Sequence, residues 1–159
     1  MAAIELLPLT HSWPLYDAAL HLPFDSQPAP FDGRAWLAHR ESRMTRDAGM
    51  GLWHCDLAAG DRLSWTGAVF SLFGLPEDEP IERAYVVSLY EGESRAAMEA
   101  LRAHAIRHMR GFSLDALIRR PDGDQRWMRL TAMPILSGGK AVGLCGTKQD
   151  VTAEYDGPG

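Results

Sequence analysis

The side chains whose spacing most directly suggests chemistry are His104 and His108, four positions apart in the sequence. The surrounding segment 93–110 has helical periodicity, so the pair lies on one side of a helix, one turn apart. Imidazoles at this spacing can hold a metal ion, but such sites carry further ligands. The sequence shows neither a His-Glu-x-x-His pattern nor a third ligand at a recognisable spacing. We therefore expect no bound metal and interpret both histidines as structural or solvated.

The cysteines and candidate nucleophiles give no stronger indication of catalysis. Cys55 and Cys145 are too sparse for a disulfide framework and lack the spacing of a zinc site. Both are predicted to be small buried apolar groups. The sequence has no Gly-x-Ser-x-Gly elbow, no phosphate-binding Walker loop and no paired-carboxylate motif. We expect a protein that is not an enzyme.

The composition indicates one globular domain. The chain has 159 residues, 46% of them hydrophobic, which is enough to bury a single core. Its formal net charge of −5 disfavours nucleic acid as a partner, because phosphate binding needs a basic surface. No apolar run approaches the ~20 residues of a membrane helix, and the N-terminus lacks the order of a signal peptide. We expect a cytoplasmic protein that binds neither nucleic acid nor a membrane.

Short motifs follow one another in a fixed order between residues 50 and 153. The first half contains Gly51-Leu52-Trp53-His54-Cys55-Asp56, then Trp65-Thr66 and Phe73-Gly74-Leu75. The second half contains Arg119-Arg120-Pro121-Asp122-Gly123-Asp124-Gln125-Arg126-Trp127 and ends with Gly146-Thr147-Lys148-Gln149-Asp150-Val151-Thr152. In order and spacing these motifs resemble the PAS family, including its C-terminal PAC-type motif. The resemblance implies an α+β fold, a five-stranded antiparallel sheet with helices on one face.

The sequence departs from the usual pattern of this family at two places. Most members of the subgroup it resembles have His-Pro-x-Asp-Arg before the long helix, and this chain has Tyr90-Glu91-Gly92-Glu93-Ser94-Arg95. The beginning of that helix is therefore expected to differ. Thr66 stands where the family usually has serine, and either hydroxyl can cap the helix that follows.

Periodicity and turn residues predict the elements in the PAS order. Strands are expected at 52–57, 62–65, 112–119, 125–136 and 141–152, with hairpins at 121–123 and 137–139. Helices are expected at 66–73, 84–89 and 93–110. Around a PAS domain at 50–153, we predict an extended Pro-containing arm at 1–31, an N-terminal helical extension at 32–49 and a short tail at 154–159.

A small-molecule pocket between the sheet and the helices is what the resemblance implies for a sensor. The candidate lining residues are Trp53, Cys55, Phe70, Phe73, Met98, Leu101, His108, Ala116, Ile118 and Leu144. The alternative is that they form an ordinary core. Haem-binding members bind iron through a histidine of the long helix, so haem at His104 or His108 is an alternative, although no cofactor is expected. The reactive cysteine of flavin-binding relatives has no counterpart in the segment 88–93.

Protein contacts are the output that the sequence favours. Leu37 and Met44 lie on one narrow apolar stripe of the helix at 32–49, which suits burial against a sheet face or a second copy. The strand at 125–136 is apolar on both sides, which predicts a covered outer face. The interface candidates are Trp36, Leu37, Met44, Trp127, Met128, Leu130 and Met133.

The segment from Asp150 to Thr152 resembles the motif through which PAS domains pass a signal to a following segment, so Asp150 and Thr152 are the candidate output residues. Only seven residues follow Thr152, so we expect either a fragment of a longer protein or a free-standing protein, and Met1 favours the latter. The resemblance is to single-domain bacterial PAS proteins that bind histidine kinases. We therefore expect a non-enzymatic, homodimeric sensory or signalling module that contacts a histidine kinase or other regulator. The alternative is a PAS sensor that binds haem or another small ligand.

Overall fold

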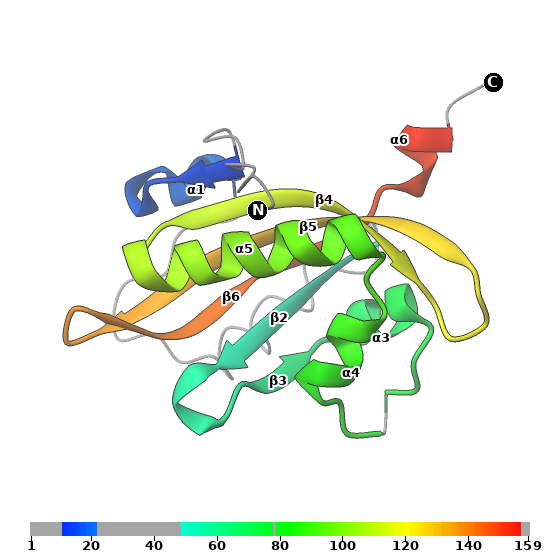
Figure 1. The fold of residues 1–159 in the computed structure, drawn as a ribbon, viewed down its shortest axis with the longest axis horizontal. Helices are drawn as coiled ribbons and strands as arrows, with labels where there is room; N and C mark the ends of the chain where they lie inside the picture. Colours follow the sequence, from blue (N-terminus) through cyan, green and yellow to red (C-terminus); the bar gives the residue numbers. More distant parts are fainter. Residues whose placement is uncertain (1–10, 22–48, 78, 157–159) are drawn as a thin grey trace, which may run out of the picture.

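An antiparallel sheet forms the centre of the computed structural model, which describes residues 11–21, 49–77 and 79–156 (Figure 1). Its strands are β1 (Ser12–Trp13), β2 (Met50–Asp56), β3 (Arg62–Trp65), β4 (Gly111–Arg119), β5 (Gln125–Ser137) and β6 (Lys140–Asp150). The strand order is β1-β4-β5-β6-β2-β3, and every neighbouring pair is antiparallel. The strand β2 therefore lies beside the last strand, β6, although most of the domain separates them in the sequence.

Two hairpins join the long strands β4, β5 and β6, as predicted. In the first, Gly123 has a φ of +93°, and its N–H donates to the Arg120 carbonyl over 2.9 Å. In the second, Gly138 and Gly139 have φ values of +59° and +77°, which a two-residue hairpin loop requires. Residues with a Cβ rarely adopt these angles, so the glycines fix where both turns form.

Three helices pack against one face of the sheet: α3 (Gly67–Phe73), α4 (Arg83–Ser88) and α5 (Gly92–His108). Helix α3 ends at Gly74, whose φ of +69° is the left-handed conformation typical of a helix C-terminus. The prediction that the Thr66 hydroxyl caps α3 was wrong. That hydroxyl instead accepts a hydrogen bond from the Leu52 N–H over 2.9 Å, so it joins the start of α3 to β2.

Alternation along β5 divides its side chains between the two faces of the sheet. Met128, Leu130 and Ala132 are buried in the main core beneath the helices. Met128 and Leu130 were predicted interface residues, and they are core residues because their register turns them toward the helices. Met133 points to the opposite face, where it packs against the buried pair Leu52 and Cys145. The prediction of two apolar faces on this strand is therefore confirmed, with two separate clusters.

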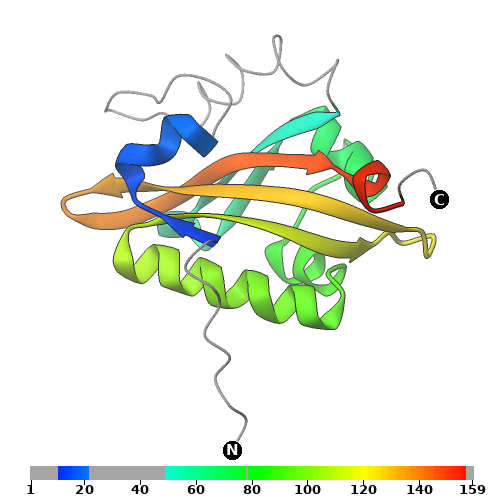
Figure 2. The same ribbon diagram turned by 90° about the horizontal axis from the view of Figure 1, so that it is seen from above.

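The N-terminal segment covers part of the outer sheet face. Strand β1 continues into the 3-10 helix η2 (Leu15–Asp17) and helix α1 (Ala18–His21), and Figure 2 shows α1 on the side of the sheet away from α5. A Cβ atom at Gly111 would lie 2.2 Å from the Trp13 ring, so glycine at this position leaves room for the indole. Trp13 and Ala18 are buried together, with Met133 packed against them.

The predicted α+β PAS arrangement is confirmed, with six strands where five were expected, because β1 pairs with β4. The prediction of an extended arm was wrong for residues 11–21, which form β1, η2 and α1. The short helix α6 (Thr152–Asp156) extends into the predicted tail at 154–159. Of the helix predicted at 32–49, residues 32–48 lie outside the described part of the chain, and they include Trp36, Leu37 and Met44.

Candidate functional site

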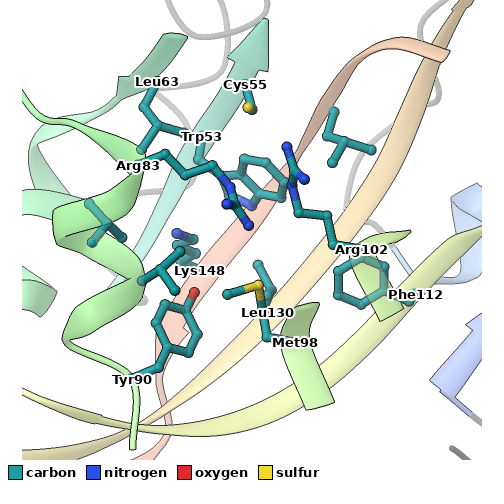
Figure 3. Close-up of a pocket in the computed structure, with 13 residues that line it drawn as sticks. Trp53, Cys55, Leu63, Arg83, Tyr90, Met98, Arg102, Phe112, Leu130 and Lys148 are labelled. Atoms are coloured by element: carbon teal, nitrogen blue, oxygen red, sulfur yellow. The ribbon is translucent and has the colours of Figure 1, made fainter. Parts of the chain in front are cut away.

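A cavity of about 50 Å³ lies between the inner face of the sheet and the helices α4 and α5 (Figure 3). Its apolar lining consists of Trp53, Leu63, Val86, Val87, Met98, Phe112, Leu130 and Leu144. Its polar lining consists of Cys55, Arg83, Tyr90, Arg102 and Lys148. Three cationic side chains thus face an otherwise largely apolar space.

Lys148 enters the cavity from β6. It is paired with Gly51 of β2 and Leu130 of β5, and this register points its side chain to the inner face. The residue is only 5% exposed. Its ammonium lies 5.1 Å from the ring centres of Trp65 and Phe73, and 5.4 Å from that of Trp53.

The surroundings of Lys148 act on its charge in two directions. Burial, assisted by the nearby Arg83, lowers its pKa from 10.5 to about 7. The aromatic faces favour the charged form through cation–π attraction. Within the described residues, no carboxylate forms an ion pair with it. Lys148 is therefore a buried amine that is close to its protonation midpoint at neutral pH.

Arg83 and Arg102 come from α4 and α5 on the helical side of the cavity. Arg83 forms an ion pair with Glu99, and Arg102 forms one with Asp61 at 3.0 Å. Their side chains are 22% and 19% exposed, so both guanidinium groups lie near the protein surface. In Figure 3 the two groups reach toward each other in front of the Trp53 ring. Each guanidinium thus has one carboxylate partner and also faces the cavity.

Tyr90 and Cys55 supply the neutral polar groups of the cavity. Tyr90 is buried, which raises its pKa, and Figure 3 shows its hydroxyl directed toward the Lys148 amine. Burial also raises the pKa of the Cys55 thiol, although the adjacent Arg102 opposes this shift. Both groups are accordingly protonated at neutral pH.

The structure separates the predicted pocket residues into three groups. Trp53, Cys55, Met98 and Leu144 line the cavity. The buried core residues outside its lining are Phe70, Phe73, Leu101, Ala116 and Ile118. His108 is exposed and was wrongly assigned to the pocket, because the inward side of α5 carries Met98, Leu101 and Ala105.

The cationic residues Arg83, Arg102 and Lys148 were missed. Long charged side chains are normally solvated, so the residue types alone give no reason to expect them in a cavity. One signal was available for Lys148, because it shares the even-numbered phase of β6 with the core residue Leu144. No comparable signal exists for the two arginines, whose direction depends on how α4 and α5 pack.

The histidine pair of α5 lies apart from the cavity. The His104 and His108 ring centres are 4.5 Å apart. Burial and the neighbouring His108 charge lower the pKa of His104. Neither ring lines the cavity, and no group of three or more potential metal-binding side chains occurs among the described residues.

The predicted output motif caps the C-terminal helix. The Asp150 carboxylate accepts hydrogen bonds from the Thr152 N–H at 3.0 Å and from the Thr152 hydroxyl at 2.6 Å. The same hydroxyl accepts from the Trp127 N–H at 3.0 Å. Arg126 lies 3.6 Å from Asp150. These contacts join the end of β6 to β5 at the point where α6 begins.

A second set of contacts holds α6 against the outer sheet face. Arg129 donates two 2.9 Å hydrogen bonds to Asp115 and also forms an ion pair with Glu154 at 2.8 Å. The Tyr155 hydroxyl donates to Asp115, and its ring stacks on Trp127 with the centres 4.3 Å apart. Trp127, a predicted interface residue, thus contacts α6 within the same chain.

Comparison with solved structures shows the same fold in sensory proteins. The N-terminal domain of a diguanylate cyclase with a PAS/PAC sensor from Marinobacter aquaeolei superposes with a TM-score of 0.61 at 14% identity, covering 67% of this chain and 98% of that one. A sensory box histidine kinase/response regulator from Burkholderia thailandensis E264 gives 0.60 at 19% identity, covering 70% and 84%.

An RNA-binding Light-Oxygen-Voltage receptor gives a TM-score of 0.58 at 16% identity, covering 66% of this chain. This chain spans only 30% of the length of that receptor. No curated protein matches the sequence significantly. Within the described residues, no helix is both long and apolar enough to cross a bilayer.

A family model described as the PAS fold matches residues 42–151, which include every strand from β2 to β6 and the helices between them. The cavity and all of the residues that line it lie within this match. The chain belongs to the PAS family.

Proposed function

We propose that the protein is a non-enzymatic signalling module that passes its state to a histidine kinase or another regulator through protein contacts. The contacts of α6 with the outer sheet face carry this proposal. Arg129, Asp115 and Glu154 form a network that is partly exposed, so a partner surface can compete for these same groups. The PAS domains of similar fold in a histidine kinase and a diguanylate cyclase support a signalling role.

The proposed output surface consists of the outward-facing residues of β5 together with α6. Trp127 and Tyr155 provide stacked aromatic area, and Arg129 provides a charge that is 40% exposed. Aromatic and arginine side chains are enriched where proteins contact one another. We propose that this surface is reached in the cytoplasm and that a second copy of the chain is one of its partners.

The test is cross-linking of the tagged full chain in its own host, followed by identification of the captured proteins. Arg129→Glu should strongly reduce capture of a histidine kinase or other regulator, because the substitution reverses the charge of the output surface. Arg62→Glu, at an exposed position on β3, is the matched control and should capture as the wild type does. Failure of the wild-type chain to capture a regulator, or equal capture by Arg129→Glu, would contradict the proposal.

A small-ligand sensor is the second candidate function, and the cavity favours it. Packing alone does not require a lysine at this buried position beside two arginines. Burial of a cation without a carboxylate partner is also costly in free energy. The haem form of this candidate has little support, because neither His104 nor His108 lines the cavity. Native mass spectrometry of protein from its own host should reveal a retained ligand that Lys148→Met loses.

A further inference from the structure

We infer that the cavity binds a small carboxylate, whose charge is neutralised by the Lys148 ammonium together with the guanidinium groups of Arg83 and Arg102. This inference rests on the second proposed function, that of a small-ligand sensor. It extends that function by naming the chemical class of the ligand.

The balance of charge around the cavity is the first step. The cavity lining contains three cationic side chains and no acidic one. Glu99 and Asp61 each pair with one arginine, and their side chains are both 41% exposed. Lys148 is the most buried of the three cations and has no such partner among the described residues. A bound anion would supply the negative charge that the cavity lacks.

The positions of the polar groups are the second step. Lys148 reaches the cavity from the sheet, whereas Arg83 and Arg102 approach from the helices (Figure 3). A carboxylate has two oxygens with several lone pairs, so it can accept from the lysine and from an arginine at once. Tyr90 adds a hydroxyl beside the lysine. A neutral or cationic ligand would leave the ammonium without a counter-charge.

The size and the apolar lining of the cavity are the third step. Its volume of about 50 Å³ is far below the ~300–1,000 Å³ of pockets for drug-sized ligands. The ligand therefore has few non-hydrogen atoms. Trp53, Met98 and Leu144 offer contacts to an alkyl group and no hydrogen bonds for a strongly hydrated dianion. These limits favour a short monocarboxylate over phosphate or a tricarboxylate.

The position of Lys148 also connects the cavity with the output motif. Lys148 and Asp150 lie two residues apart on β6 and point to the same face of the sheet. Asp150 accepts the two hydrogen bonds that hold the beginning of α6. Movement of Lys148 toward a ligand would therefore act on the strand that ends at this cap. Ligand binding is expected to alter the exchange protection of α6.

Binding should depend on pH in a defined direction. The charged and titratable groups that face Lys148 are Arg83, Arg102, Cys55 and Tyr90. Burial raises the pKa of Cys55 and of Tyr90, whereas it lowers the pKa of Lys148 to about 7. The protonated lysine attracts the carboxylate, so affinity should fall as the pH rises above about 7. By linkage, the bound carboxylate should raise the pKa of Lys148.

Selective labelling gives a direct readout, because Lys140 and Lys148 are the only lysines in the chain. With ¹³C-lysine, the two side-chain ε-methylene signals can be assigned using Lys140→Met. Sodium propionate is the probe, with propionamide as the neutral analogue and sodium chloride at equal ionic strength as the salt control. A ligand of so few atoms is expected to bind with a Kd of about 1 mM.

We expect propionate to shift the Lys148 signal and to raise its pKa, whereas propionamide and chloride leave it unchanged. Lys148→Met should weaken propionate binding by at least about tenfold, as for loss of a hydrogen bond to a charged group. Binding to this variant is followed by the change in total tryptophan fluorescence, because Trp53 lines the cavity. Arg83→Met, at the partly exposed edge of the cavity, should weaken binding while the fold is retained. Lys140→Met should bind as the wild type does.

Several outcomes would overturn the inference. Equal effects of propionamide and propionate, or a neutral ligand in the native mass spectrum, would reject the carboxylate and leave the sensor function standing. An unchanged Lys148 signal with propionate, together with no retained ligand, would reject both the carboxylate and the sensor function. Neither result would bear on the proposed signalling through protein contacts, which the cross-linking experiment tests separately.

Discussion

Lys148 and Arg129 lie on neighbouring strands of one sheet, but their surroundings are opposite. Lys148 points to the inner face, is buried among aromatic rings and has a pKa lowered to about 7. Arg129 points to the outer face, binds two carboxylates and has a raised pKa. Among the described residues, Lys148 has no carboxylate partner and Arg129 has two. This difference fits the proposals made above, in which the inner face binds an anion and a partner competes for the contacts of the outer face.

The largest effect is expected from removing the buried charge. Folded Lys148 has a pKa of about 7 and the unfolded lysine 10.5, so between these values the unfolded chain binds more protons. Stability should therefore rise with pH across this window, by at most about 1.4 kcal/mol per pH unit. Lys148→Met should remove this slope and stabilise the protein at pH 6, on the order of a few kcal/mol. Denaturant unfolding at pH 6 to 8.5 measures both effects.

The matched control for that experiment is Lys140→Met, because Lys140 is exposed on the β5–β6 hairpin. Its pH dependence should equal that of the wild type. Burial raises the pKa of Cys55 and Cys145 above 9.0, which lowers stability at higher pH, so the window ends below this value. A Lys148→Met variant with the wild-type slope would show that the lysine is solvated in the folded protein.

The second prediction concerns the hydrogen bonds of Thr152 with Trp127 and Asp150, which join the end of β6 to β5 where α6 begins. Thr152→Val keeps the side-chain shape but leaves the partly buried Trp127 N–H without its acceptor and Asp150 without one donor. The expected cost is about 1–2 kcal/mol, with faster amide exchange in α6. Thr152→Ser retains the hydroxyl and should lose much less. A loss for Thr152→Ser with little or none for Thr152→Val would mean that methyl packing, and not the hydroxyl, stabilises this contact.

The hairpins and the long helix differ from the cavity in how far the sequence could predict them. The hairpins follow from local chemistry, because Gly123, Gly138 and Gly139 occupy positive φ positions that few other residues tolerate. The long helix was predicted at 93–110 and forms at Gly92–His108. These features depend on residues that are close together in the sequence, so a single sequence contains the information that predicts them.

The cavity depends instead on contacts between distant segments. Arg83 and Arg102 face it only because of how α4 and α5 pack over the sheet, and a helical wheel does not specify that arrangement. Strand β1 was missed because it has two residues, and its pairing requires the space that Gly111 leaves for Trp13. The predicted pocket therefore shares four of its ten residues with the cavity, and the cationic residues of the cavity were not predicted.

The third prediction tests the charged contacts of the outer face. Arg129→Met removes the ion pairs with Asp115 and Glu154, in a network whose side chains are 23–58% exposed. Solvent screening limits the expected loss to about 1 kcal/mol. Exchange of α6 amides should increase while the pKa of Lys148 stays unchanged. A changed Lys148 pKa would show that the two faces are coupled electrostatically and not through β6 alone.

The smallest effect is expected from protonating the outer network. Burial alone would raise the pKa of Asp115, but hydrogen bonds from Arg129 and Tyr155 outweigh it, and the pKa lies below its usual 3.8. The Asp115 contribution to stability is therefore present above this value and is lost as the pH falls through the lower, folded-state pKa. Because the network is partly exposed, the expected loss is about 0.5 kcal/mol or less.

Tyr155 fluorescence is unsuitable beside Trp127, so the measurement is amide exchange of α6 between pH 5 and pH 3. Asp115→Asn should exchange faster at pH 5 and show a weaker acid dependence than the wild type. An identical acid dependence in both proteins would assign the change to Glu154 or to another carboxylate, and would leave Arg129 held to the sheet without Asp115.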